Sequence, residues 1–152
     1  MAGKLIPFGY LARGSQERLT QLMADQEALL VDIRFKPHSK RPEWRQMALE
    51  EYWGDHQRQG TGRYHYLGEL GNVNYRSGGP IQLSSPHYGL AVLKTLLNRY
   101  NIVLLCACAC YDTCHRKVVV DMVREKYPDV DIVLEDVPVA PAPPVAQQEP
   151  LW

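Results

Sequence analysis

Residues 101–123 read NIVLLCACACYDTCHRKVVVDMV, and this stretch decides the fold class. The apolar run at 101–105 predicts a buried strand, and the amphipathic segment from His115 predicts the start of a helix. The connection between these two elements contains every cysteine of the chain: Cys106, Cys108, Cys110 and Cys114. In an α/β protein such a connection opens at the carboxyl edge of the sheet, where ligands usually bind.

The segments on either side repeat the alternation of strand and helix. Hydrophobic patterning predicts strands at residues 5–9, 28–33, 63–67, 101–105 and 130–134. Helices are predicted at residues 15–24, from Pro42 onward, at 86–100 and at 115–127. The sequence therefore predicts a three-layer α/β fold, with a mostly parallel sheet of about five strands and helices on both faces.

Three less regular segments complete the chain. The helix that begins at Pro42 should turn one side inward, because the following residues recur at helical spacing: Trp44, Met47, Ala48, Glu51 and Tyr52. Residues 68–85 are rich in Gly, Asn, Ser and Pro and predict a long loop, which in a compact domain is usually functional or mobile. Residues 137–152 are rich in proline and predict an extended or disordered tail after a single domain at 1–136.

The composition is that of an ordinary globular domain. The chain has 152 residues, 45% of them hydrophobic and 22% charged, with a formal net charge of zero. A neutral chain argues against a large basic surface for nucleic acid, although a local basic patch remains possible. No apolar run is long enough to span a membrane, and no leader peptide is evident, so we expect a cytoplasmic protein. Clustered cysteines in that compartment are more often metal ligands or reactive thiols than disulfides.

Several short motifs resemble those of an uncharacterised bacterial and archaeal family, catalogued as domain of unknown function 488. The resemblance extends over residues 5–135. It rests on an early glycine, an Asp-x-Arg strand end with a following Pro and Ser, a Tyr-Leu-Gly, and a late Cys followed by Cys-His-Arg. The matching residues here are Gly9, Asp32, Arg34, Pro37, Ser39, Tyr66, Leu67, Gly68, Leu70, Gly71, Cys106, Cys114, His115 and Arg116.

The resemblance implies an α/β fold and a site at these motifs, but it implies no reaction. The family has a glutamate two residues after the strand cysteine, and this chain has Cys108 there. Cys110 is a further thiol outside the family pattern. If the glutamate orients a ligand or a base in the relatives, this protein performs that step differently.

The predicted topology brings the motif residues to one sheet edge. Asp32 and Arg34 follow the second strand, and the planar guanidinium of Arg34 suits a phosphate, carboxylate or sulfate. Arg116 is the other candidate for holding such an anion. The resemblance adds Ser39 and Tyr66 to the candidate ligand-binding residues. The Asp–Arg pair has an alternative role, because it would also brace the following loop.

Cysteine chemistry is the leading functional hypothesis. Cys114 lies near a predicted helix N-terminus, which lowers the pKa of a thiol, and Cys106 is the other candidate nucleophile. His115 would act as the proton shuttle. The expected protein is a small enzyme that binds an anionic, nucleotide-like ligand, although Cys106 would equally suit a buried core position. The sequence leaves open whether the protein is an enzyme at all.

Two other functions remain open. A metal-binding or redox-sensing module would use soft donors drawn from one group: Cys106, Cys108, Cys110, Cys114 and His115. A nucleic-acid- or partner-binding domain would use residues 34–45, where basic side chains are interrupted by Phe35 and Trp44. The alternative for that segment is a solvated loop before a helix whose Trp44 faces the core. The sequence identifies no particular cofactor.

Overall fold

The computed structural model describes residues 3–54 and 62–134 of the chain. The described part contains the strands β1 (Lys4–Gly9), β2 (Leu29–Asp32), β3 (Tyr64–Tyr66), β4 (Ile102–Cys106) and β5 (Asp131–Ile132). It contains the α-helices α1 (Ser15–Asp25), α2 (Gln46–Leu49), α3 (Pro86–Leu97) and α4 (His115–Lys126). The predicted tail at residues 137–152 lies outside the described residues. Within the described part, no helix is long and apolar enough to cross a membrane.

The sheet has five strands, all parallel, in the order β3-β2-β4-β1-β5. The predicted α/β fold with a mostly parallel sheet is therefore confirmed. The central strand β4 pairs with β1 on one side and with β2 on the other. After β2 the chain moves outward to β3, whereas after β4 it crosses β1 to reach β5. Neighbouring strands whose connections diverge in this way leave a crevice at their carboxyl ends.

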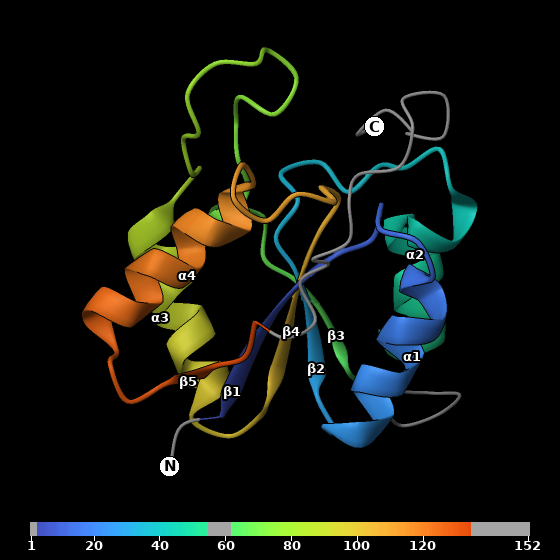
Figure 1. The fold of residues 1–152 in the computed structure, drawn as a ribbon, viewed down its shortest axis with the longest axis horizontal. Helices are drawn as coiled ribbons and strands as arrows, with labels where there is room; N and C mark the ends of the chain where they lie inside the picture. The colour runs from blue at the N-terminus through green and yellow to red at the C-terminus, as the bar shows by residue number, and fades with distance from the viewer. Residues whose placement is uncertain (1–2, 55–61, 135–152) are drawn as a thin grey trace.

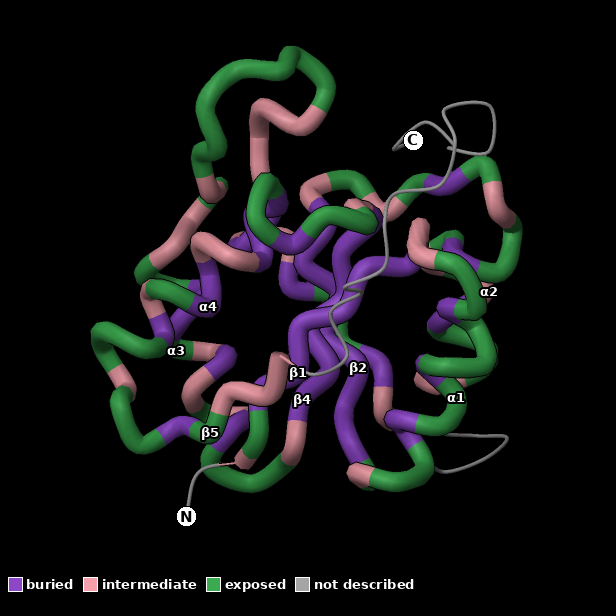
Figure 2. The backbone as a smooth tube through the Cα atoms, viewed as in Figure 1, coloured by how far each residue is buried: buried purple, intermediate pink, exposed green. Residues whose placement is uncertain are grey.

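Helices cover both faces of the sheet (Figure 1). Helices α1 and α2 lie on one face, and α3 and α4 lie on the other. The alternation of side chains along β4 serves both layers: Leu104 packs with the α3 and α4 side, whereas Leu105 packs with the α1 side. Buried residues run through the middle layer, while exposed residues lie on the outer surfaces of the helices (Figure 2). Cys106 shares the face of Leu104 and therefore lies on the α4 side.

The predicted regular helix after Pro42 is wrong in its detail. The chain forms a 3₁₀ turn at Pro42–Trp44, then the short helix α2, then a wider π-type turn at Glu50–Gly54. Trp44 is buried and stacks on the ring of Tyr10 at a centroid distance of 5.0 Å. Because Arg45 is extended, with ψ of 150°, the helical phase is lost after this anchor. Met47 and Tyr52 are consequently 81% and 56% exposed rather than facing the core.

The segment at 68–85 contains more structure than the predicted loop. It begins with a 3₁₀ turn at Gly68–Leu70, and a β-bridge joins Asn72 to Leu83. Gly71 lies so close to the backbone of Phe35 that a β-carbon there would collide with it. This contact holds the loop against the chain that leaves β2, at the carboxyl edge of the sheet.

Candidate functional site

The ends of β2 and β4 lie side by side at the carboxyl edge of the sheet. The amide of Ile33 donates to the carbonyl of Leu105 at 3.0 Å, so the pairing continues one residue beyond β2. A cavity of about 270 Å³ opens beside these strand ends. Its lining includes basic, thiol and imidazole side chains: Arg34, Lys36, Cys106, Cys108, Cys114 and His115. The loop at 68–85 supplies another wall, with Asn72, Asn74 and Tyr75.

Two buried thiols face each other at this edge. Cys106 is the last residue of β4, and Cys114 is the residue that precedes the first turn of α4. The thiol of Cys114 donates to the sulfur of Cys106, with the two Sγ atoms 3.1 Å apart. Both cysteines are free. The strand and the helix thus bring together two residues that the chain separates by a loop, which we call the cysteine loop (residues 106–114).

His115, the first residue of α4, joins the two thiols. Its Nδ1 lies 3.5 Å from the Sγ of Cys106 and 3.9 Å from the Sγ of Cys114. Its Nε2 lies 2.8 Å from the carbonyl oxygen of Ile33. Because a carbonyl oxygen can only accept a hydrogen bond, the contact assigns the proton of the neutral ring to Nε2. The lone pair of Nδ1 therefore faces the two sulfurs.

The two buried thiols influence each other's ionisation. Although burial opposes it, the pKa of Cys106 is lowered, because Cys108 and Cys114 donate to its thiolate and Arg116 adds a positive charge. Burial and the bond to Cys106 raise the pKa of Cys114, so the lowering predicted from its place at the helix N-terminus is wrong. Burial lowers the pKa of His115. Of the two buried thiols, Cys106 therefore ionises more readily, and burial favours the neutral form of the imidazole.

The other two cysteines lie in different environments. Cys108 is half-buried and lines the cavity, and its hydrogen bond with Cys106 raises its pKa to about 11. Cys110 is exposed. Extended backbone would have placed alternate cysteines on one face, but β4 ends at Cys106 and the chain turns. Cys110 therefore does not belong to the compact group.

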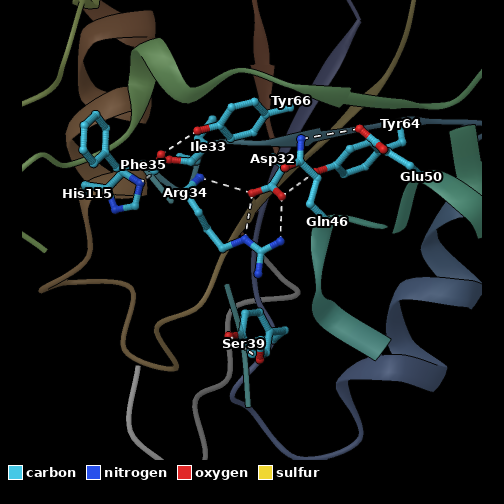
Figure 3. A network of polar contacts seen from close by, with 11 residues as sticks. Asp32, Ile33, Arg34, Phe35, Ser39, Gln46, Glu50, Tyr64, Tyr66 and His115 are labelled. Carbon is cyan, nitrogen blue, oxygen red and sulfur yellow. Dashed lines mark hydrogen bonds and ion pairs between the residues drawn. The ribbon is translucent and has the colours of Figure 1, made fainter. Parts of the chain in front are cut away.

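Asp32 is the buried anchor at the end of β2, as Figure 3 shows. Its carboxylate accepts hydrogen bonds from Nε and Nη2 of Arg34 at 2.9 and 2.7 Å. The hydroxyl of Tyr64 donates to the same carboxylate at 2.6 Å. Burial opposes the charge of Arg34, but the hydrogen bonds and charge of Asp32 raise its pKa further. The arginine therefore stays charged although it is only 5% exposed.

Arg34 keeps one donor group that Asp32 does not use. Nη1 is buried and has no hydrogen-bond partner within the described part of the chain. It points away from the carboxylate of Asp32 (Figure 3), and the guanidinium lies 5.5 Å from the ring centroid of Tyr10. A buried unpaired donor costs about 1–3 kcal/mol. Other parts of the Arg34 side chain line the cavity, so an anion bound there would lie close to a fixed positive charge.

Two predicted ligand-binding residues have structural partners instead. Ser39 is buried, and its Oγ accepts hydrogen bonds from the hydroxyl of Tyr10 at 2.9 Å and from the amide of Arg41 at 3.1 Å. The hydroxyl of Tyr66 donates to the carbonyl of Phe35 at 2.5 Å. Among the described residues that line the cavity, neither Ser39 nor Tyr66 occurs. Both shape the chain that follows β2.

Arg116 lies behind the cysteine loop and not in the cavity lining. It is fully buried, its Nη2 donates to the carbonyl of Ala109 at 3.4 Å, and its guanidinium lies 5.6 Å from the ring centroid of Tyr111. A β-carbon at Gly9 would collide with both Arg116 and the carbonyl of Cys108. The glycine at the end of β1 thus makes room for a positive charge close to Cys106. This geometry favours an electrostatic role over direct contact with a ligand.

Sequence reasoning missed two partners of the site. The carbonyl of Ile33 orients His115, but a backbone acceptor leaves no side-chain signal in a sequence. Tyr10 lies under the guanidinium of Arg34 and positions Ser39. The available signal was its place directly after Gly9, at the carboxyl end of a predicted strand.

The same donors form the group that suits a metal ion. One ligand atom from each of Cys106, Cys114 and His115 lies within 4.8 Å of the other two, and all three residues are buried. Thiolate and imidazole donors suit Zn²⁺ and other soft or borderline cations. The hydrogen bond from His115 to Ile33 is the kind of outer contact that orients a metal-ligating imidazole. Cys108 lines the same cavity and is available as a fourth donor.

Comparison with known proteins adds no assignment. No protein-family model, no curated protein and no solved structure matches the chain. The resemblance to the uncharacterised family in the sequence motifs therefore stays a prediction. What the protein does has to be argued from the site itself.

Proposed function

We propose that the protein is a cysteine-dependent enzyme that acts on a small anionic substrate at the carboxyl edge of the sheet. One arrangement carries the proposal: Cys106 and His115 lie 3.5 Å apart, and the carbonyl of Ile33 fixes the imidazole. A nucleophile, a base and a group that orients the base define the general pattern of nucleophilic catalysis. The same cavity holds the charged Arg34.

Each residue has a role in this proposal. Cys106 is the nucleophile, because its thiolate is favoured over that of Cys114. His115 accepts and returns protons through Nδ1. Arg34 attracts the anionic group of the substrate through its positive charge, and Asp32 keeps the guanidinium in place. Arg116 stabilises the thiolate from behind the cysteine loop.

A nucleotide or another phosphate-bearing molecule is the kind of ligand that this cavity supports. Lys36 and His38 add basic groups to the wall that contains Arg34. On the same cavity, the rings of Phe35 and Tyr75 lie 6.4 Å apart, and both are partly buried. Aromatic faces next to basic groups can hold a flat ring with an attached phosphate. The free buried thiols also favour the proposal of a reducing, cytoplasmic environment.

Competition between two alkylating reagents tests the proposed function. Iodoacetate carries a carboxylate, and iodoacetamide is its neutral counterpart. In the Cys110→Ser protein we expect both reagents to modify Cys106. The further substitution Arg34→Gln should lower the ratio of the iodoacetate rate to the iodoacetamide rate about tenfold, because the attraction of a charged donor for the carboxylate is lost. Peptide mass spectrometry measures the modified fraction.

The matched control is Arg124→Gln, which removes an exposed cation from α4 and should leave the ratio unchanged. Circular dichroism of each variant verifies that it is folded. A Cys106 that reacts with neither reagent, or a ratio that Arg34→Gln does not alter, would contradict the proposed function.

A metal centre is the second candidate, favoured by the three buried donors within 4.8 Å of one another. After removal of bound metal by a chelator, the reduced protein should bind one Zn²⁺ per chain, as measured by titration and native mass spectrometry. Cys106→Ser and Cys114→Ser should weaken binding by about a hundredfold. Cys110→Ser should leave zinc binding intact because that thiol is exposed and outside the group. Zinc bound equally well by all variants would exclude this centre.

The nucleic-acid alternative receives less support from the geometry. Trp44 is buried in the core, so it is not available to stack on a base. Arg45 donates to the carbonyl of Ser39 at 2.9 Å, and Arg41 donates to the carbonyl of Tyr10 at 3.3 Å. These contacts fold the basic segment around the end of β1, as the solvated-loop alternative requires.

A further inference from the structure

The contact between the two buried thiols has a consequence for the kind of reaction. An enzyme that forms an acyl or phosphoryl intermediate needs one nucleophilic sulfur. Here a second sulfur lies 3.1 Å from the first, closer than the imidazole at 3.5 Å. Any group that becomes attached to Cys106 through a sulfur–sulfur bond would lie next to Cys114. Attack of Cys114 on the Sγ of Cys106 would then displace that group.

We propose that this site reduces anionic substrates that carry an electrophilic sulfur, and that the Cys106–Cys114 disulfide is the oxidised form of the enzyme. The inference rests on the proposed function, because it assumes that Cys106 is the nucleophile and that Arg34 holds the anion. It names the substrate class, which is an anionic disulfide or thiosulfonate, and the reaction class, which is a two-electron reduction.

The electrons balance in two displacements. The thiolate of Cys106 attacks a substrate sulfur, a bond forms between the two sulfurs, and the first leaving group departs with the electron pair of the broken bond. His115 then takes the proton of Cys114, and the Cys114 sulfur attacks the Sγ of Cys106. The second leaving group departs as a thiolate anion. The substrate gains two electrons, the enzyme becomes a disulfide, and an external dithiol restores it.

The surrounding residues fit this sequence. The Nδ1 of His115 lies 3.9 Å from the Sγ of Cys114, so one small movement brings the acceptor to the thiol proton. Arg34 lines the same cavity, and its positive charge attracts an anionic group there. Both sulfurs are buried at the wall of the cavity, so the covalent intermediate is shielded from bulk water.

Tetrathionate is a suitable probe, because it is a dianion whose central sulfur–sulfur bond is electrophilic. The reduced, metal-free Cys110→Ser protein is treated with one equivalent. We expect loss of two hydrogens per chain, release of two thiosulfate ions, and a disulfide between Cys106 and Cys114 in the peptide map. In Cys114→Ser we expect one thiosulfate group to stay attached to Cys106.

Two comparisons separate the possible failures. Arg34→Gln should slow oxidation by tetrathionate about tenfold and should not slow oxidation by neutral 4,4′-dithiodipyridine. A Cys108→Ser variant should still form the disulfide, because Cys108 supplies only a hydrogen bond to Cys106 and neither of the bonded sulfurs. A disulfide between Cys106 and Cys108 in the parent protein would overturn the inference.

The parent Cys110→Ser protein, which keeps Cys106 and Cys114, tests the inference even if a further variant misfolds. If Cys106 takes up the thiosulfate group but Cys114 never displaces it in the parent protein, the inference fails and the proposed nucleophile stands. If Cys106 does not react with tetrathionate, iodoacetate or iodoacetamide, the proposed function fails as well.

Discussion

A buried arginine with one carboxylate partner sets the energetics at the scale of single residues. Asp32 accepts from two of the guanidinium nitrogens of Arg34, and Tyr64 donates to Oδ2, the oxygen that also accepts from Nη2. Removal of one partner from such a pair leaves an uncompensated charge in the interior. The carboxylate of Asp32 is therefore the group that compensates the buried charge of Arg34.

The substitution Asp32→Asn tests this dependence. It removes the negative charge beside the buried Arg34 and keeps the size of the side chain, so we expect unfolding to become easier by about 3–5 kcal/mol. Urea denaturation monitored by circular dichroism measures the loss. The control Asp121→Asn breaks the exposed 2.8 Å pair with Lys117 and should cost under about 1 kcal/mol. Equal losses of unfolding free energy in the two variants would show that Asp32 does not compensate the buried charge of Arg34.

Four residues of the predicted site line the cavity, namely Arg34, Cys106, Cys114 and His115, but their contacts could not be predicted from the sequence. Spacing after two strands was sufficient to place Arg34, Cys106 and His115 at one edge. The orientation of His115 depends on a backbone carbonyl, and no residue type in the sequence encodes such an acceptor. The sequence analysis expected Arg116 to contact the ligand, but the cysteine loop covers this side chain. The loop and Arg116 fit there because Gly9 has no β-carbon.

At the scale of elements, the segment from Pro42 to Gly54 shows how one anchor overrides a periodic pattern. Helical spacing predicted a single inward face, but Trp44 packs between Phe8 and Tyr10, with ring centroids 6.2 and 5.0 Å away. Burial of a large ring outweighs the small preference for an uninterrupted helix. The backbone is therefore extended at Arg45, and the side chain of Met47 faces solvent.

Paired alanine substitutions separate the two descriptions of this segment. Trp44→Ala should destabilise the fold by about 3–5 kcal/mol, because it empties a buried site. Met47→Ala should change stability by under about 0.5 kcal/mol, because the side chain is 81% exposed. Thermal and urea unfolding measure both. A large loss at Met47 would mean that the segment forms the continuous helix that the spacing predicts.

The whole molecule follows from a few strong regularities in the sequence. Apolar runs of strand length, separated by helical patterns, identified the parallel three-layer fold. Parallel strands that are buried on both faces consist almost entirely of apolar residues. The strand order was not predictable, since it depends on which faces the helices cover. That order decides where the crevice lies: β2 and β4 are neighbours only because the chain reverses direction across the sheet between them.

The bond between His115 and Ile33 joins residues 82 positions apart in the sequence. Contacts of such separation form late in folding, because the chain entropy lost in closing a long loop must be offset by other contacts first. During synthesis from the N-terminus, the strand that carries Ile33 emerges long before the helix that carries His115. The imidazole thus reaches its position beside the paired sulfurs only when the sheet is complete, so we expect unfinished or unfolded chains to lack the proposed reactive centre.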